Sequence, residues 1–124
     1  MATASAIIDR AYSLLGFKAA GEALSADDAD YALDALNTLV NGWNSQPLFV
    51  PLVAGVATAI PAFANLATDY PLAPGYTKAL QYSLAEELAP GVKEVPLSVA
   101  RMAANARRAI RRNNARVPLL DITL

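Results

Sequence analysis

The sequence predicts a mainly α-helical domain of four helices, interrupted by a proline-rich section between the second and third helices. Apolar residues recur at three- and four-residue spacing in four separate stretches, which is typical of amphipathic helices. Five of the eight prolines fall between residues 47 and 74. With 124 residues, 55% hydrophobic and 17% charged, the chain suits one small folded domain, and this composition excludes wholesale disorder.

The first helix is expected over residues 4–15, and Gly16 is expected to end it. The second helix is expected to start at Ser25, whose hydroxyl can accept a hydrogen bond from a backbone amide of the first turn, and to run to about Asn44. Its apolar stripe consists of Ala29, Leu33, Leu36, Leu39, Val40 and Trp43. We expect Trp43 to pack in the core rather than to stack on a ligand.

The section over residues 47–74 has a different character from the predicted helices. Leu48–Val50 and Val53–Ile60 are candidates for short strands, with a turn at Ala54 and Gly55. Prolines within this section would confine such strands to the edge of a sheet. The sequence therefore predicts either an extended proline-rich loop or a small β-hairpin here.

The third and fourth helices are expected over residues 74–89 and 98–113. Pro90 and Gly91 separate them, because proline and glycine commonly follow a helix end. The predicted domain organisation is a helical domain over residues 1–114, followed by a C-terminal tail.

The residue types exclude most catalytic chemistry. The chain has no cysteine and no histidine, so thiolate and imidazole groups are missing from it. Adjacent Glu86 and Glu87 point about 100° apart on a helix, and we expect them on a solvated face. Asp27, Asp28 and Asp30 suit the start of a helix better than a calcium loop. We therefore expect no enzyme activity and no catalytic, cofactor-binding or metal-binding residues.

Basic charge is concentrated at the C-terminal end of the chain. Residues 99–124 carry six arginines and one aspartate, whereas residues 1–62 carry two basic and six acidic groups. Such segregation often faces a partner, and the guanidinium fork suits phosphates and carboxylates. The fourth helix is therefore expected either to present a solvated basic face or to contact protein or nucleic acid. Its arginines are Arg101, Arg107, Arg108, Arg111 and Arg112.

The tail over residues 115–124 is unusually apolar for a chain end. It holds Val117, Leu119, Leu120, Ile122 and Leu124. Chain ends are normally polar, so these side chains are expected to be covered. The tail either folds back on its own domain or, as we expect, docks on a partner by strand addition or in an apolar groove.

One uncharged stretch requires a comparison with membrane spans. Residues 48–66 are nearly all apolar, and a spanning helix needs about 20 such residues. Prolines interrupt this run, however, and its flanks are acidic rather than basic. We expect no membrane partner, and a membrane-associated helical protein is kept as an alternative.

Four stretches, taken in order, resemble a phage protein family. They are Ile7–Gly16 with Gly21 and Glu22; Ser25–Ala29 leading into Ala35–Asn37 and Trp43; Pro74–Tyr76 with Ala79, Leu80, Leu84, Ala85 and Leu88–Pro90; and the alanine- and arginine-rich helix ending at Arg111–Asn114. Together they look like the head-to-tail adaptors of tailed phages, the tail accessory or packaged-DNA-stabilisation family. The family usually has a longer β-rich section after the tryptophan than this chain has.

The resemblance implies a structural virion protein with a mainly helical protomer. Such a protein forms a ring, commonly a dodecamer, under the portal in the neck of the virion after assembly in the host cytoplasm. The ring extends the DNA channel, helps retain packaged DNA and binds tail or neck proteins. The resemblance also implies that the apolar tail contacts the portal. The arginines would then lie between subunits or along the DNA channel, where they contact DNA of any sequence. The alternative is a small helical DNA-binding or regulatory domain that uses the arginine-rich helix.

Overall fold

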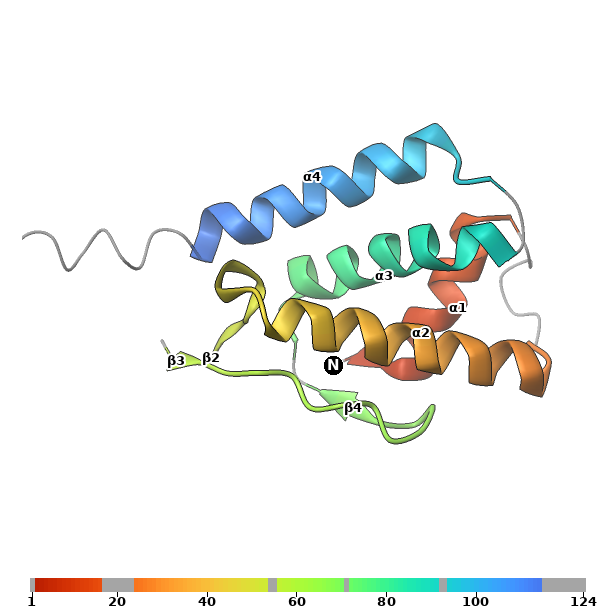
Figure 1. Cartoon of the computed structure of the whole chain (residues 1–124), viewed down its shortest axis with the longest axis horizontal. Coiled ribbons are helices and arrows are strands. Elements are labelled where there is room, and N and C mark those ends of the chain that lie inside the picture. The colour runs from red at the N-terminus through yellow and green to blue at the C-terminus, as the bar shows by residue number, and fades with distance from the viewer. Residues whose placement is uncertain (1, 17–23, 54–55, 71, 92–93, 115–124) are drawn as a thin grey trace, which may run out of the picture.

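The computed structural model describes residues 2–16, 24–53, 56–70, 72–91 and 94–114. Helices make up most of this part of the chain, and two short antiparallel strand pairs accompany them (Figure 1). In chain order the elements are β1 (Ala2–Thr3), α1 (Ala4–Leu14), α2 (Ala26–Asn44), the 3-10 helix η1 (Pro47–Phe49), β2 (Leu52–Val53), β3 (Val56–Ala57), β4 (Asp69–Tyr70), α3 (Pro74–Leu88), the 3-10 helix η2 (Ala89–Gly91) and α4 (Leu97–Asn114). The mainly helical class predicted from the sequence is confirmed.

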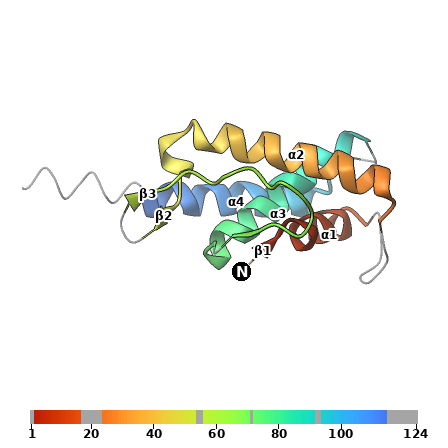
Figure 2. The same ribbon diagram turned by 90° about the horizontal axis from the view of Figure 1, so that it is seen from below.

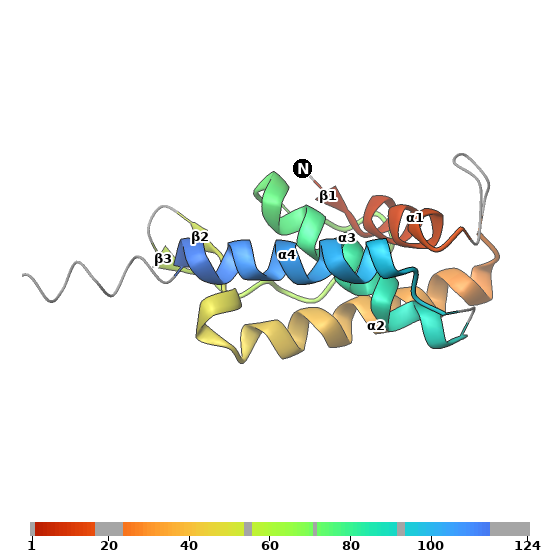
Figure 3. The same ribbon diagram turned by 90° about the horizontal axis from the view of Figure 1, so that it is seen from above.

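Helix α3 lies at the centre of the molecule and packs against each of the other three α-helices (Figure 1, Figure 3). Its buried residues are spread around its circumference: Tyr76, Ala79, Leu80, Tyr82, Ser83, Leu84, Ala85 and Leu88. A helix with buried residues around most of its circumference must be covered on most sides by other elements. The four-residue repeat of Leu80, Leu84 and Leu88 marks one side of α3, and all three are fully buried.

The other three helices are amphipathic and cover α3 with one face each. The buried residues of α1 are Ala4, Ile7, Ile8, Ala11 and Tyr12, those of α2 are Ala29, Ala32, Leu36, Val40 and Trp43, and those of α4 are Val99, Ala103 and Ile110. The three- and four-residue spacing places each set on one side of its helix. The opposite sides of α2 and α4 are exposed.

The helix ends follow the capping residues in the sequence. The Thr3 hydroxyl accepts a hydrogen bond from the Ala6 amide at 3.1 Å, and Ser25 Oγ accepts one from the Asp28 amide at 3.1 Å. Gly16 follows α1 with a φ of 72°, a left-handed conformation that glycine adopts at little cost. The predicted limits of all four helices agree with the observed ones to within a residue or two. The predicted tail over residues 115–124 lies outside the described residues.

The section between α2 and α3 contains a small β-hairpin, one of the two alternatives that the sequence predicted. Strands β2 and β3 pair with Leu52 opposite Ala57 and Val53 opposite Val56. The strand predicted at Leu48–Val50 was wrong, because Pro47–Phe49 forms a 3-10 helix instead. Proline suits the first position of such a turn.

The strand pair β1–β4 was not expected from the sequence. It joins the N-terminal end of the described chain to the segment just before α3, with Ala2 opposite Tyr70 and Thr3 opposite Asp69. Strands of two residues carry too short a pattern to be recognised in a sequence. The pair anchors the start of α1 beside the residue 60–70 segment.

Two asparagines of α2 hold an extended segment against the helix. Asn44 Oδ1 accepts a hydrogen bond from the Ile60 amide at 3.0 Å, and its Nδ2 donates to the Ile60 carbonyl at 2.8 Å. Asn37 binds the amide and carbonyl of Phe63 in the same way, at 2.7 and 3.0 Å. Each side-chain amide thus makes the two hydrogen bonds that a residue of a neighbouring β-strand would make. The two are seven residues apart, so they project from the same side of α2.

An aromatic cluster packs at the C-terminal end of α2. Trp43 is 5% exposed, stacks on Phe49 with ring centroids 4.9 Å apart, and meets Tyr76 edge-on at 5.5 Å. The Tyr76 hydroxyl donates a hydrogen bond to the Phe49 carbonyl at 2.7 Å. The expectation that Trp43 packs in the core is confirmed.

Replacing Asn44 with alanine is expected to destabilise the protein by about 1–3 kcal/mol, because the amide and carbonyl of Ile60 lose their partners. Asn41 is a matched control, since it lies on the same helix and its side chain is exposed. N41A should change the free energy of unfolding by less than about 0.5 kcal/mol. Urea denaturation measures both, and equal effects would contradict the role of Asn44.

Tyr76 is expected to make stability fall at alkaline pH. Burial raises the pKa of its hydroxyl well above the ordinary value of about 10. The unfolded chain therefore releases this proton first, so stability is full below about pH 10 and declines as pH rises toward the raised pKa of the folded state. Y76F should be less stable at neutral pH, because it loses the hydrogen bond to the Phe49 carbonyl. Its free energy of unfolding should also decline less steeply above pH 10. Denaturation at a series of pH values, with Y31F as the exposed control, tests this.

Candidate functional site

The arginines of α4 fall into two groups, as their helical spacing predicts. Arg107 and Arg111 reach over neighbouring elements of the same chain. Arg101, Arg108 and Arg112 are exposed along the outer side of the helix. Arg111 is exposed as well, but its guanidinium lies over the Phe49 ring, so within the described residues the second group alone makes no hydrogen bond, ion pair or ring contact with another element.

Arg107 joins α4 to α3. Its Nη1 donates hydrogen bonds to Ser83 Oγ at 2.9 Å and to Glu86 Oε1, and the side chains of Arg107 and Glu86 are each 28% exposed. Ser83 is buried, so the arginine satisfies a polar group inside the helix packing. Glu86 was expected on a solvated face; it is partly exposed, and its carboxylate also forms this ion pair. Glu87 is exposed as expected.

Arg111 and Asn114 bind the end of α4 to η1. The Arg111 guanidinium lies over the Phe49 ring, 5.5 Å from its centroid. Asn114 Nδ2 donates to the carbonyls of Leu48 and Val50, at 2.6 and 3.2 Å. These contacts connect residues more than sixty positions apart and hold the C-terminal end of α4 against the segment that follows α2.

The outer side of α4 carries a row of four exposed residues, the arginine stripe: Arg101, Asn105, Arg108 and Arg112. Steps of four, three and four residues place them on one side of the helix. Arg108 Nη1 donates to Asn105 Oδ1 at 3.0 Å. Within the described residues, the Arg107–Glu86 pair is the one ion pair, so the three arginines of the stripe have no carboxylate partner in that part of the chain.

The outer side of α2 carries a corresponding row, the acidic stripe: Asp27, Tyr31, Asp34 and Thr38, all exposed. Asp30 lies beside it and is also exposed. Tyr31 has 56% of its surface exposed, which is high for an aromatic side chain. Asp27 and Asp28 lie in the first turn of α2, where the helix dipole stabilises negative charge, as predicted from the sequence.

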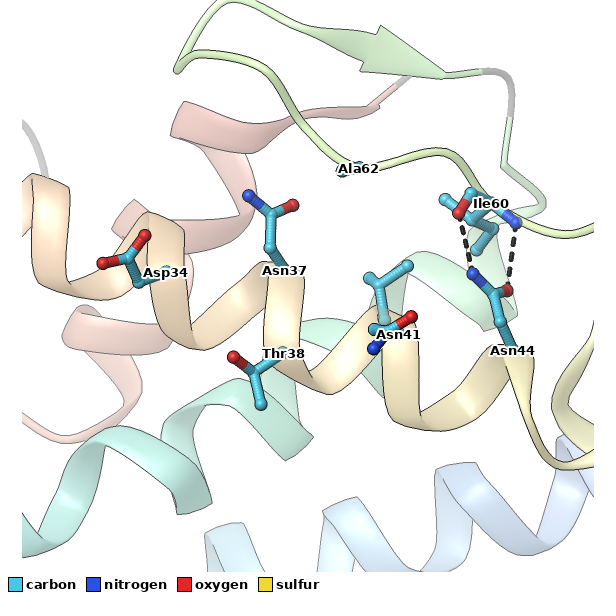
Figure 4. A pocket seen from close by; sticks show the side chains of 8 residues that line it. Asp34, Asn37, Thr38, Asn41, Asn44, Ile60 and Ala62 are labelled. Atoms are coloured by element: carbon cyan, nitrogen blue, oxygen red, sulfur yellow. Dashed lines mark hydrogen bonds between the residues drawn. The ribbon is translucent and has the colours of Figure 1, made fainter.

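A groove runs beside the acidic stripe, between α2 and the segment over residues 60–62. Figure 4 shows Asp34, Asn37 and Asn41 along the helix, with Asn44 bound to Ile60. The groove has a volume of about 550 Å³, and its lining consists of Asp34, Asn37, Thr38, Val40, Asn41, Asn44, Ile60 and Ala62. Asp34 is the one ionisable side chain in this lining. The groove therefore offers polar contacts but no pair of groups for acid–base catalysis.

Neither a metal-binding cluster nor a membrane-spanning helix occurs in the part of the chain that the structure describes. No group of three or more metal-binding side chains occurs among these residues. None of the helices there has the length and apolar character needed to cross a membrane. The predicted tail residues Val117, Leu119, Leu120, Ile122 and Leu124 lie beyond the described residues.

Comparison with known proteins finds no matching family model, no matching curated protein and no matching solved structure.

Replacing Arg107 with alanine is expected to cost about 1–3 kcal/mol of stability, because the change leaves Ser83 and Glu86 without their partner. R108A is the matched control, since Arg108 contacts only Asn105 on its own helix. We expect R108A to stay within about 0.5 kcal/mol of the parent protein. Denaturant unfolding of the two variants separates the structural arginine from the exposed one, and an equal loss would refute the division.

Proposed function

We propose that this chain is a structural protein of a tailed-phage virion: a head-to-tail adaptor that forms a homo-oligomeric ring under the portal. The ring would extend the DNA channel, help to retain packaged DNA and present a surface for tail or neck proteins. It would assemble in the host cytoplasm and remain in the neck of the virion. The role requires positioning rather than catalysis.

The observation that carries the proposal is the placement of opposite charge on two different sides of one rigid helical domain. The acidic stripe of α2 and the arginine stripe of α4 are both exposed, and α3 lies between their helices (Figure 1). A ring needs a heterologous interface, in which one surface meets a different surface of the next copy. Complementary stripes on separate helices meet that requirement.

The weakness of exposed ion pairs favours assembly on a template. Each such pair contributes about 0–1 kcal/mol, which is small against the cost of association. Copies that first bind a portal are held at high local concentration, so weak lateral contacts suffice there. We therefore propose that the isolated protein associates weakly and that rings form chiefly on the portal.

The sequence resemblance supports the same role. Within the described residues, the four stretches that resemble phage adaptors fall largely on α1, α2, α3 and α4 in that order. By the same resemblance, the apolar tail over residues 115–124 is proposed to dock on the portal. Packaged DNA would pass the arginines without base readout, because phosphate contacts carry no sequence information.

A second candidate is a small DNA-binding or regulatory domain. It is favoured by Arg101, Arg108 and Arg112, whose guanidinium groups lie on one exposed side of α4 and can contact phosphates. Such a protein would be a monomer or dimer whose affinity for duplex DNA falls steeply as salt increases.

Native mass spectrometry of the purified chain, alone and with portal rings from the same source, tests the proposal. We expect monomers and small oligomers alone, and a single ring per portal in the mixture. Deleting residues 116–124 should preserve the helical circular dichroism spectrum and abolish portal binding. Binding of the truncated chain as before would refute the docking role of the tail.

Two results would refute the adaptor role itself. One is the failure of the full chain to bind portal rings at any ratio. The other is tight, salt-sensitive binding to a defined duplex by a monomer or dimer, which would support the second candidate.

A further inference from the structure

We propose that neighbouring copies of this chain join through the two stripes, with α4 of one copy lying parallel to α2 of the next. The inference rests on the proposed ring, and it specifies the residues that meet. Arg101 would face Asp27, Asn105 would face Tyr31, Arg108 would face Asp34, and Arg112 would face Thr38.

The spacing of the two stripes carries the inference. Both follow steps of four, three and four residues, so their members occur at the same heights along the two helices. The two aspartates are seven residues apart, and so are Arg101 and Arg108, which corresponds to a rise of about 10.5 Å in each helix. All eight side chains are exposed, and none of the three arginines has a carboxylate partner within the described residues.

The direction follows from two observations. With all four positions of each stripe matched, the parallel arrangement places both aspartates opposite an arginine, whereas the antiparallel one pairs only Asp27, with Arg112. Within one molecule, α2 and α4 run in the same direction: both run from right to left in Figure 1, and Figure 2 and Figure 3 agree. Copies related by a small rotation keep that direction, so α4 of one copy reaches α2 of the next in parallel.

The polar groove beside α2 offers hydrogen-bond acceptors to Arg112, the last arginine of the stripe. In the parallel register Arg112 lies opposite Thr38, which lines the groove together with Asp34 and Asn41. A guanidinium has five donors, and the hydroxyl, amide and carboxylate oxygens there are acceptors. Arg107 and Arg111 take no part, because they already hold α4 to α3 and η1.

Charge reversal tests the pairing on the portal. R101D/R108D and D27R/D34R should each fail to form a ring, because like charges then face each other. An equimolar mixture of the two should form mixed rings, since every interface in alternating order is again complementary. The chain carrying all four changes should form rings with itself but should not enter wild-type rings.

Two controls make this result specific. R10D makes the same charge change as R108D at another exposed arginine, on α1, and should assemble normally. Circular dichroism reports whether each variant is folded. If circular dichroism shows that the change at Asp27, in the first turn, weakens α2, the single variant D34R is used in place of D27R/D34R.

Disulfide cross-linking measures the register, because the chain contains no cysteine of its own. A mixture of T38C and R112C proteins should cross-link several-fold faster than a mixture of T38C and R101C proteins. Faster cross-linking of the second mixture would indicate the antiparallel register and overturn the proposed one.

The outcomes distinguish the interface from the function. If both charge-reversed variants form rings on the portal as the wild type does, the interface is wrong and the adaptor role stands. If the wild type forms no ring on the portal, the adaptor role fails and the interface fails with it. If R101D/R108D loses only affinity for duplex DNA, the stripe serves nucleic acid and the pairing is overturned.

Discussion

The structure depends on the enclosure of α3. This helix has apolar residues around most of its circumference, and it is stable only while α1, α2 and α4 cover it together. Each covering helix buries one side and leaves the other exposed. The charged outer sides of α2 and α4 are therefore a direct result of how α3 is covered, and they are held in fixed relative positions by the core.

Much of this arrangement could be predicted from the sequence. Helix limits follow from local signals such as Ser25, Gly16 and Pro74, which act on residues a few positions away. The contacts of Asn37 and Asn44 with a distant segment could not be predicted in the same way, since they depend on the path of the chain after residue 50. The seven-residue spacing of the two asparagines was the available signal, and it indicates a polar face without identifying its partner.

The arginines show the same limit more sharply. Composition and helical spacing predicted a basic helix with Arg107 beside the face of Arg108, yet they could not show that Arg107 bonds to another helix. The distinction arises from Ser83 and Glu86, which lie on α3 and meet only Arg107. A charged side chain near a helix interface can be part of the packing, whereas its neighbour one position along points about 100° away, toward solvent.

The asparagine contacts with residues 60–63 also bear on aggregation. An extended segment that lies outside a sheet normally presents free amides and carbonyls to any passing strand. Here Asn44 and Asn37 occupy both groups of Ile60 and of Phe63, the Tyr70 hydroxyl donates to the Ala62 carbonyl at 2.8 Å, and Pro61 has no amide hydrogen to donate. Unwanted strand pairing between copies is the contact from which fibrils begin. The occupied amides and carbonyls leave this segment few free groups for such pairing.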